Sequence, residues 1–269
     1  MPFAEVIGDP IAQSKSPIIH KYWLKQLGIE GEYVRTRVAA DELSDFMTRR
    51  RSDPEWRGCN VTIPHKQAIM PLLDRLDQGA EAIGAVNCVV SAEDGLAGYN
   101  SDIDGVAAAL DSVELKGRNA VVIGAGGGAR AVVAYLAQRN AEIVVLARNP
   151  AKADELSSLA PVRILPLEQA VDAFQGASVI VNATSMGMAG ADPMPKPLLA
   201  AARTHSEDAI LFDMVTTPAD TEFLACGDRT VDGLTMLIGQ ARRAFELFFG
   251  SSPPQGDAEL RRLLTGADQ

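Results

Sequence analysis

The chain has 269 residues, of which 47% are hydrophobic and 22% charged; this composition excludes wholesale disorder and allows one large domain or two smaller ones. Acidic residues outnumber basic residues by 35 to 25, and the net charge of −10 argues against nucleic-acid and anionic-membrane partners. The three cysteines form no disulfide or metal-binding pattern, and the sequence shows neither a signal peptide nor a long apolar span, so we expect a soluble cytoplasmic protein without a metal.

The first part of the chain alternates predicted strands and helices. The apolar run Ala4–Gly8 predicts a strand, and Ser16 is expected to cap a helix that starts with Pro17 and extends to Leu27. Hydrophobic periodicity predicts further strands at Tyr33–Val38, Cys59–Thr62 and Val86–Val90, and helices at Asp41–Arg50, Gln67–Leu76 and Asp104–Leu110.

The second part continues this alternation with nearly continuous aliphatic runs, which are typical of parallel strands covered by helices on both faces. Strands are predicted at Ala120–Ile123, Ile143–Leu146, Val162–Leu165, Val179–Val181 and Ile210–Phe212, and helices at Ala129–Gln138 and Leu237–Phe249. The pattern favours an α/β fold. The polar segment Val113–Asn119 suggests a domain boundary, and a second is placed near Asp232, so we expect one domain of residues 1–112 completed by 233–269 and another of residues 113–232.

A glycine-rich loop follows the strand predicted at Ala120–Ile123. The loop reads Gly124-Ala125-Gly126-Gly127-Gly128-Ala129 and satisfies the dinucleotide-binding pattern G-x-G-x-x-A between a strand and a helix. Gly124 permits a tight turn, Gly126 lets the backbone approach a pyrophosphate, and Ala129 allows close packing of helix on strand. The alternative is an ordinary glycine-rich turn, but the flanking strand and helix favour a dinucleotide site.

The end of the next predicted strand bears on the choice of cofactor. An acidic residue there would hold the ribose 2′-hydroxyl of NAD, but the sequence is Ala147-Arg148-Asn149, with Lys152 one helical turn later. Glu142 begins this strand and therefore lies at the wrong end. Arg148 and Lys152 could bind a 2′-phosphate, which favours NADP over NAD, although both could also be ordinary surface charges.

Polar clusters in the first domain are candidates for substrate binding and proton transfer. Ser14-Lys15-Ser16-Pro17 could hold a carboxylate at a helix N-terminus, although capping alone would explain Ser16. Lys66 ends the cluster Asn60-Val61-Thr62-Ile63-Pro64-His65-Lys66 and could transfer a proton, although most isolated lysines face solvent. Gly98-Tyr99-Asn100-Ser101-Asp102 is a third cluster, which an Asx turn would also explain. Spacing alone does not place Lys66 beside Asp102.

Taken together, these motifs resemble the shikimate dehydrogenase family in both order and spacing. They are Ser14-x-Ser16-Pro17, Asn60-Val61-Thr62-x-Pro64-x-Lys66, Gly84-Ala85-Val86-Asn87, Asn100-Ser101-Asp102, the glycine loop, Asn182-Ala183-Thr184-Ser185-x-Gly187-Met188 and Gly233-Leu234-x-Met236-Leu237-x-x-Gln240. The resemblance implies an N-terminal α/β substrate domain with a mixed sheet, a Rossmann-like NADP domain, and C-terminal helices that pack back on the first domain.

The resemblance also implies an activity: the reversible NADP-dependent reduction of 3-dehydroshikimate to shikimate, on the pathway to chorismate and aromatic amino acids. Lys66 and Asp102 would be the catalytic pair. The substrate-binding residues would be Ser14, Ser16, Thr62, Asn87 and Gln240. The cofactor-binding residues would be those of the glycine loop with Arg148, Lys152, Thr184, Ser185, Met186, Met214, Gly233 and Met236. The partner is then a small-molecule substrate, and we expect a monomer or a homodimer.

The sequence departs from the family pattern at a few positions. Ser101 and Cys88 stand where the family usually has threonine, and Asn149 replaces a threonine beside Arg148. Thr216 stands where the family commonly has a tyrosine near the substrate carboxylate. Thr216 and the altered cofactor residues leave open a quinate/shikimate or aminoshikimate dehydrogenase of the same family. A separate alternative, from a different class, is a catalytically silent dinucleotide sensor whose binding regulates a partner.

Overall fold

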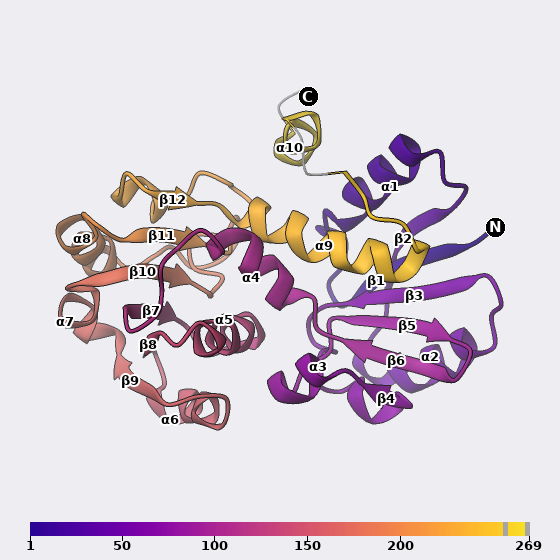
Figure 1. Cartoon of the computed structure of the whole chain (residues 1–269), viewed down its shortest axis with the longest axis horizontal. Coiled ribbons are helices and arrows are strands. Elements are labelled where there is room, and N and C mark those ends of the chain that lie inside the picture. The colour runs from indigo at the N-terminus through magenta and orange to yellow at the C-terminus, as the bar shows by residue number, and fades with distance from the viewer. Residues whose placement is uncertain (255–257, 267–269) are drawn as a thin grey trace. The chain divides into compact units, whose positions relative to one another are not determined.

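The computed structural model describes residues 1–254 and 258–266, and it divides the chain into two compact units. Unit 1 contains Met1–Asp102 and the segment that begins at Gln240, and unit 2 contains Ile103–Gly239 (Figure 1). The chain passes between the units within the helices α4 (Asp102–Leu110) and α9 (Gly233–Phe249). The boundary expected near residue 112 therefore lies after α4 and the one near Asp232 lies before α9, whereas the two units divide within these helices.

Unit 1 is built on a mixed sheet, as the family resemblance implied. Its strands are β1 (Phe3–Gly8), β2 (Glu32–Arg37), β3 (Trp56–Val61), β4 (Arg75–Leu76), β5 (Cys88–Ala92) and β6 (Gly95–Tyr99). The strand order is β2-β1-β3-β5-β6-β4. β1 pairs in parallel with β2 and β3, whereas β5 runs antiparallel to both β3 and β6.

The helices of unit 1 include one correction to the sequence prediction. They are α1 (Ser16–Leu27), α2 (Leu43–Arg51), α3 (Gln78–Ile83) and α10 (Ala258–Thr265), with 3₁₀ turns at Ala40–Glu42 and Met70–Leu72. The helix predicted over Gln67–Leu76 is wrong, because that segment forms turns, a 3₁₀ turn and β4. Pro71 explains the difference: it has no N–H to donate to the carbonyl of Gln67, as an α-helix would require.

α3 and β6 are among the elements of unit 1 that were not predicted. β6 contains Gly95 and Gly98, and glycine weakens the strand signal. Gly98 is nevertheless required, because a Cβ there would lie 2.6 Å from Leu73 Cδ1 and 2.9 Å from Val86 Cγ2. α3 has only 6 residues, too few to show a helical period, and its start is fixed by the Asp77 carboxylate, which accepts the Ala80 N–H at 2.8 Å.

His20 of α1 is fully buried in an aromatic cluster of unit 1. Its ring stacks on Tyr33 at a centroid distance of 3.9 Å and also packs against Phe245 at 5.8 Å. Among the described residues, neither ring nitrogen has a hydrogen-bond partner. Desolvation lowers the pKa of His20 from 6.5 to about 3, so the folded protein keeps this ring neutral.

This burial predicts a loss of stability in acid. Below pH 6.5 the unfolded chain protonates His20 and the folded protein does not, so the free energy of unfolding falls as the pH falls toward 3. Between pH 7 and pH 5, urea unfolding should show the wild type losing about 2 kcal/mol more than His20→Phe. His205→Gln, at the partly exposed end of an unrelated helix, is the control. Equal losses in wild type and His20→Phe would contradict the assignment.

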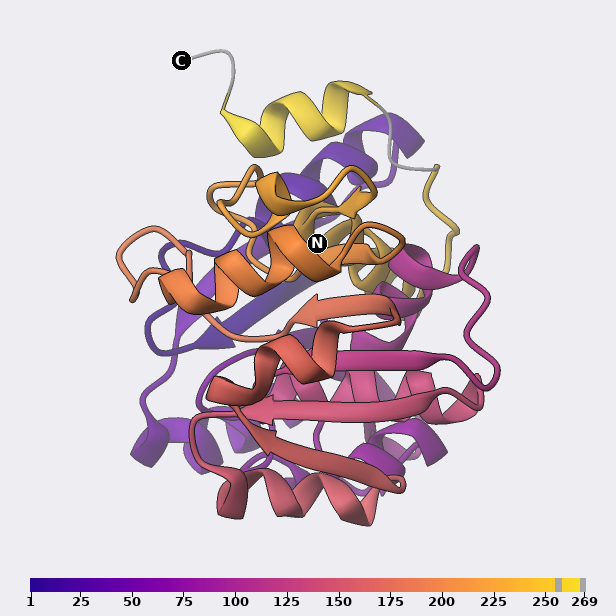
Figure 2. The ribbon, with the colours of Figure 1, turned by 90° about the vertical axis from the view of Figure 1, so that its left-hand side faces the viewer.

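Unit 2 is built on a parallel sheet with the Rossmann order. Its strands are β7 (Asn119–Ile123), β8 (Glu142–Ala147), β9 (Val162–Pro166), β10 (Ala177–Asn182), β11 (Ile210–Asp213) and β12 (Thr230–Val231). The order β12-β11-β10-β7-β8-β9, with all pairs parallel, is the doubly wound arrangement of dinucleotide-binding domains. Figure 2 faces this sheet and shows its strands side by side. The strands predicted after residue 120 are confirmed.

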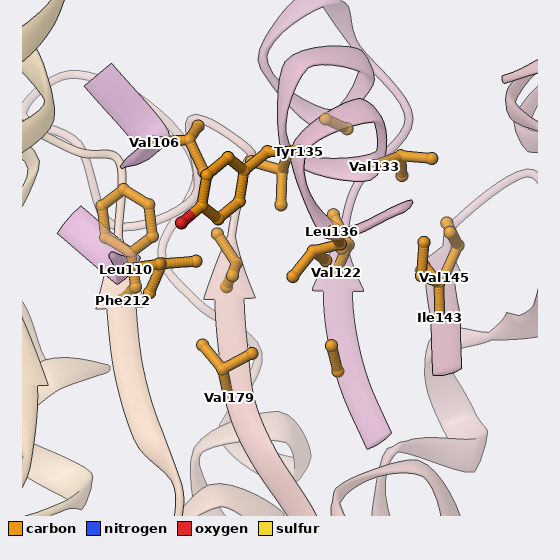
Figure 3. Close-up of a cluster of buried hydrophobic side chains, with 14 of the residues drawn as sticks. Val106, Leu110, Val122, Val133, Tyr135, Leu136, Ile143, Val145, Val179 and Phe212 are labelled. Atoms are coloured by element: carbon orange, nitrogen blue, oxygen red, sulfur yellow. The ribbon is translucent and has the colours of Figure 1, made fainter. Parts of the chain in front are cut away.

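Helices cover both faces of the unit 2 sheet. Besides α4, they are α5 (Gly127–Gln138), α6 (Pro150–Ala153), α7 (Ala170–Phe174) and α8 (Lys196–His205). 3₁₀ turns lie at Asp154–Ser158, Leu167–Gln169 and Leu224–Cys226. Val122, Val145 and Val179 point to the face covered by α4 and α5, where they meet Leu136 and Leu110 (Figure 3). Their sequence neighbours, such as Val121 and Val144, pack on the opposite face with α7 and α8. Within residues 1–254 and 258–266, no helix is both long and apolar enough to cross a membrane.

Candidate active site

The loop between β1 and α1 holds two serine hydroxyls close together. The Ser14 hydroxyl donates to Ser16 Oγ at 3.3 Å, and the Ser16 N–H donates to Ser14 Oγ at 3.4 Å. The expectation that Ser16 caps α1 is wrong: the helix begins at Ser16 itself, and Lys15 occupies the capping position without a side-chain hydrogen bond. The Arg35 Nε–H of β2 donates to the Ser14 carbonyl at 2.8 Å and so holds the loop in place. The two hydroxyls thus lie together at the N-terminus of α1, an end of a helix that favours anions.

Thr62 lies next to this loop. It directly follows β3, its N–H donates to the Ile7 carbonyl at 3.0 Å, and it is half-buried. A Cβ at Gly8 would lie 2.5 Å from Thr62 Cγ2, so the end of β1 has room for Thr62 only because residue 8 is glycine. The parallel pairing of β1 and β3 thus brings Thr62 to the same edge of the sheet as the loop with Ser14.

Lys66 and Asp102 are adjacent, although 36 positions separate them in the sequence. Lys66 Nζ donates to Asp102 Oδ2 at 2.5 Å, and the two side chains are 23% and 10% exposed. The Val86 N–H donates to the Lys66 carbonyl at 2.8 Å, which holds the segment after Pro64 against the start of β5. The pair is thus largely shielded but still reachable by a small molecule.

Asn87 and Ser101 fix the carboxylate of this pair. Asn87 Nδ2 donates to the other Asp102 oxygen, Oδ1, at 2.8 Å and to Ser101 Oγ at 3.1 Å. The Ser101 N–H donates back to Asn87 Oδ1 at 2.7 Å. The Ser101 hydroxyl also donates to Gln240 Oε1 at 3.4 Å, which brings the C-terminal segment to the same cluster. Ser101, which stands where the family usually has threonine, therefore still supplies a hydroxyl that forms hydrogen bonds in this cluster.

Asn100 lies just before α4 and helps to set the position of Asp102. Its Oδ1 accepts the Asp102 N–H at 3.0 Å, which is the Asx turn considered from the sequence. Its Nδ2 donates to the Ala85 carbonyl at 2.9 Å. The Asx turn expected from the sequence thus positions the carboxylate of Asp102, whose proposed role in catalysis stays a prediction. The sequence analysis assigned Asn100 no role of its own. Its place in the motif Asn100-Ser101-Asp102 was the only sequence feature that could have indicated one.

In unit 2 the glycine loop forms the start of α5. Gly124 has a φ of +110°, and a Cβ there would lie 2.6 Å from Thr184 Cγ2, so only glycine fits. Gly126 is the capping residue, and a Cβ there would meet no atom within 4 Å. The first turn of α5 has no acidic residue and no side-chain cap, so its N–H groups can donate to an anion. Gly127 is its first residue, Ala125 is half-buried, and Ala129 packs in the core.

Several of the other predicted cofactor residues meet this loop at the carboxyl ends of the strands. A Cβ at Gly128 would lie 2.7 Å from Met214 Cε, and one at Gly233 would lie 2.7 Å from the Met214 carbonyl oxygen. The Met186 N–H donates to Thr184 Oγ1 at 3.1 Å, although the Met186 side chain is buried. Ligands of doubly wound sheets bind at this edge.

The remaining predicted cofactor residues are Ser185, Met236, Arg148 and Lys152. Ser185 is exposed, and Met236 packs in the hydrophobic core of unit 2. Arg148 follows β8 and contacts Asp192 at 3.7 Å, with both side chains largely exposed. The Asn149 side chain caps α6 by accepting the Lys152 N–H at 3.3 Å. Two cations thus follow the strand next to the glycine loop, where a dinucleotide's ribose binds, and the residues present fit NADP.

Comparisons with known proteins agree with this geometry. Three family models match the chain: the shikimate dehydrogenase substrate binding domain over residues 6–89, shikimate / quinate 5-dehydrogenase over 107–220, and the shikimate 5′-dehydrogenase C-terminal domain over 233–258. A shikimate dehydrogenase (NADP(+)) from Sphingopyxis alaskensis is 47% identical over 272 residues, covering 98% of this chain and 97% of the relative.

Two solved structures show how far the likeness extends. The shikimate 5-dehydrogenase of Thermus thermophilus, in complex with NADP(H) and shikimate, is 35% identical with a TM-score of 0.84, and 99% of each chain is covered. A 5-ketofructose reductase of a Gluconobacter strain is 27% identical with a TM-score of 0.83, covering 99% of this chain and 98% of that one. From the family models and the full-length relative, this chain belongs to the shikimate dehydrogenase family.

Proposed function

We propose that the protein catalyses the reversible NADP-dependent reduction of 3-dehydroshikimate to shikimate, a step toward chorismate and the aromatic amino acids. The observation that carries this proposal is the shielded ion pair of Lys66 and Asp102, with a separation of 2.5 Å, in the unit that matches the family's substrate binding domain. A ketone reductase needs a proton donor at the carbonyl oxygen, and a lysine ammonium held by a carboxylate provides one.

The roles proposed for the pair follow from its contacts. When bound, the nicotinamide of NADPH supplies the hydride. Lys66 Nζ donates a proton to the oxygen that becomes the C3 hydroxyl of shikimate, and in the oxidative direction the same nitrogen accepts it. Asp102 orients the ammonium, and Asn87 holds Asp102 through its second oxygen. Gln240, which contacts Ser101, would bind a ring hydroxyl.

The carboxylate of the substrate is proposed to bind at the loop between β1 and α1. Ser14 and Ser16 offer two hydroxyls 3.3 Å apart, and Thr62 lies at the adjacent end of β3. Hydroxyl donors at a helix N-terminus favour an anion. This subsite would orient the ring so that its reacting carbon faces Lys66.

The cofactor is proposed to bind along the glycine loop of unit 2. Gly124 to Ala129 would cradle the pyrophosphate, and Arg148 and Lys152 would hold the 2′-phosphate. Thr184, Ser185, Met186, Met214, Gly233 and Met236 would surround the nicotinamide half.

Arg148 makes this assignment testable. Arg148→Ala is expected to raise the KM for NADP+ about tenfold and to leave the KM for NAD+ unchanged, because only NADP+ carries the phosphate that the guanidinium would bind. Steady-state kinetics with both cofactors measure the ratio. Arg163→Ala, on the exposed face of β9, is the control. A KM for NADP+ that stays at the wild-type value would remove Arg148 from the cofactor site.

The substrate is tested by comparing turnover of shikimate, quinate and aminoshikimate with NADP+ and with NAD+. We expect the highest kcat/KM for shikimate with NADP+. A preference for quinate or aminoshikimate would instead point to the alternatives that Thr216 raised, and binding of NADP+ without turnover of any of the three would point to a sensor.

The proposal extends to the location and assembly of the protein. A cytoplasmic location is supported by Cys59, Cys88 and Cys226, which are buried and form no disulfide within the described residues, as expected in a reducing compartment. We expect a monomer or a homodimer, and light scattering of the purified protein would distinguish them.

A further inference from the structure

One buried carboxylate of unit 2 contacts both loops that follow β10 and β11. Asp213 ends β11, and its side chain is fully buried. Its Oδ1 accepts hydrogen bonds from Asn182 Nδ2 at 2.9 Å and from the Val215 N–H at 3.0 Å. Its Oδ2 accepts one from the Thr221 hydroxyl at 2.6 Å. Asp213 thus connects the end of β10 with the loop that continues from its own strand, and the proposed reaction gives it no role.

Asn182 extends this contact to Thr184. It ends β10 and is also fully buried. Asn182 Oδ1 accepts the Thr184 N–H at 3.1 Å and the Thr184 hydroxyl at 2.7 Å, and Asn182 Nδ2 also donates to the Met186 carbonyl at 3.1 Å. Because a Cβ at Gly124 would lie 2.6 Å from Thr184 Cγ2, the loop after β10 lies directly against the glycine loop. The hydrogen bonds of Asp213 and Asn182 therefore lead from β11 to the glycine loop.

Part of the space between the loops after β10 and β11 is a cavity. Its volume is about 270 Å³, and residues of both loops line it, such as Met186 and Thr221. Side chains that line a cavity make fewer packing contacts, so hydrogen bonds account for more of what holds the two loops together. Apart from the contacts of Asp213, the Ala189 N–H of one loop donates to the Thr217 carbonyl of the other at 2.9 Å.

We propose that Asp213 is a positioning residue that holds the two cofactor-binding loops in place before the cofactor arrives. Its hydrogen bond from the Val215 N–H fixes the backbone directly after Met214, and its hydrogen bond from Asn182 fixes the side chain that holds Thr184. Loops that already have their bound arrangement lose less freedom on binding, which raises affinity. The inference rests on the proposed function, since it takes Thr184 and Met214 as residues around the nicotinamide half.

The test is Asp213→Ala, compared with Asp213→Asn by calorimetric titration with NADP+. The alanine removes the acceptor of Asn182 and Val215, so we expect the Kd for NADP+ to rise about tenfold. The asparagine keeps an oxygen that can accept from both, so its Kd should stay within about threefold of wild type. An unchanged Kd in Asp213→Ala would overturn the proposal. So would an Asp213→Asn variant as impaired as Asp213→Ala, because the charge and not the hydrogen bonds would then matter.

Thr221→Val is the matched control. It removes the donor to Asp213 Oδ2 and leaves both contacts of Oδ1 in place, so it should lower the Tm without changing the Kd for NADP+. If Thr221→Val and Asp213→Ala raised the Kd equally, the effect would be a general loosening of unit 2, and the proposal would be overturned.

A fragment of the cofactor separates positioning from a general structural effect. Adenosine 2′,5′-bisphosphate carries the 2′-phosphate but no nicotinamide, so Asp213→Ala should leave its Kd within about twofold of wild type. Arg148→Ala should instead weaken binding of the fragment and of NADP+ alike, since Arg148 is proposed to hold the 2′-phosphate. An equal loss of both ligands in Asp213→Ala would overturn the proposal.

The wild type distinguishes this inference from the proposed function. A wild-type protein that binds neither NADP+ nor the fragment would overturn the proposed function and this inference with it. A wild-type protein that binds NADP+ but does not oxidise shikimate would overturn the proposed function alone.

A further measurement on the wild type covers the case in which Asp213→Ala fails to fold. The Thr184 and Val215 N–H groups donate to the side chains of Asn182 and Asp213, so hydrogen exchange followed by NMR should show both amides protected in the cofactor-free protein. Adding NADP+ should change their exchange rates little. If either amide exchanged as fast as in an unfolded chain until NADP+ was added, the cofactor and not Asp213 would order the loops, and the proposal would be overturned.

Discussion

Lys66→Ala is expected to lower kcat for shikimate oxidation by a factor of about 10²–10⁴, while the Kd for shikimate changes much less. The reason is that Lys66 Nζ is the proposed proton carrier, whereas the carboxylate end of the substrate would be held by other residues. Steady-state rates of NADPH formation give kcat, and calorimetric titration of the variant with shikimate gives Kd.

The control for this prediction is Lys21→Ala, because Lys21 is an exposed lysine of α1 in the same unit. It should leave kcat at the wild-type value. If Lys66→Ala also kept the wild-type kcat, Lys66 would not be the proton carrier. A loss of shikimate binding without a loss of kcat would make it a binding residue only.

Asp102→Asn should lower kcat by a factor of about 10²–10³, the second-largest effect that we expect. The change keeps the shape of the side chain but removes the charge that holds the Lys66 ammonium at 2.5 Å. The amide could still accept from Asn87, so the fold around it should persist, and the loss should appear in kcat. Thermal unfolding alongside the kinetics checks that the variant is folded.

Asp94→Asn provides the comparison for this charge removal. Asp94 forms an exposed ion pair with Arg75 at 3.2 Å in the same unit, and exposed pairs of this kind contribute little. Its loss should leave kcat unchanged. An Asp102→Asn enzyme with a wild-type kcat would show that the carboxylate neither orients Lys66 nor contacts the substrate in the reaction.

The Rossmann-like unit was largely predictable from the sequence because its signals are local. Buried parallel strands appear as continuous aliphatic runs, and the glycine loop lies directly between β7 and α5. The same local rules failed at Gln67–Leu76, where an apparently helical pattern contains Pro71 and forms turns instead. They also failed at Ser16, which begins α1 instead of capping it.

The candidate site in unit 1 was predictable only through the family resemblance. Periodicity gives no means of placing Lys66 beside Asp102, because that contact depends on the pairing of β5 with β3 and β6 and on the Asx turn at Asn100. Tyr33 was predicted only as a strand residue. Its hydrogen bond to Asn60 depends on the strand order that sets β1 between β2 and β3, which sequence patterns do not fix.

The most direct test of this account is the reduction of 3-dehydroshikimate by the purified protein with NADPH, followed by loss of absorbance and by chromatography of the product. The account predicts that one NADPH is consumed for each shikimate formed, and that NADPH alone is stable in the presence of the protein. No consumption of NADPH on addition of 3-dehydroshikimate, from protein shown to be folded, would contradict it.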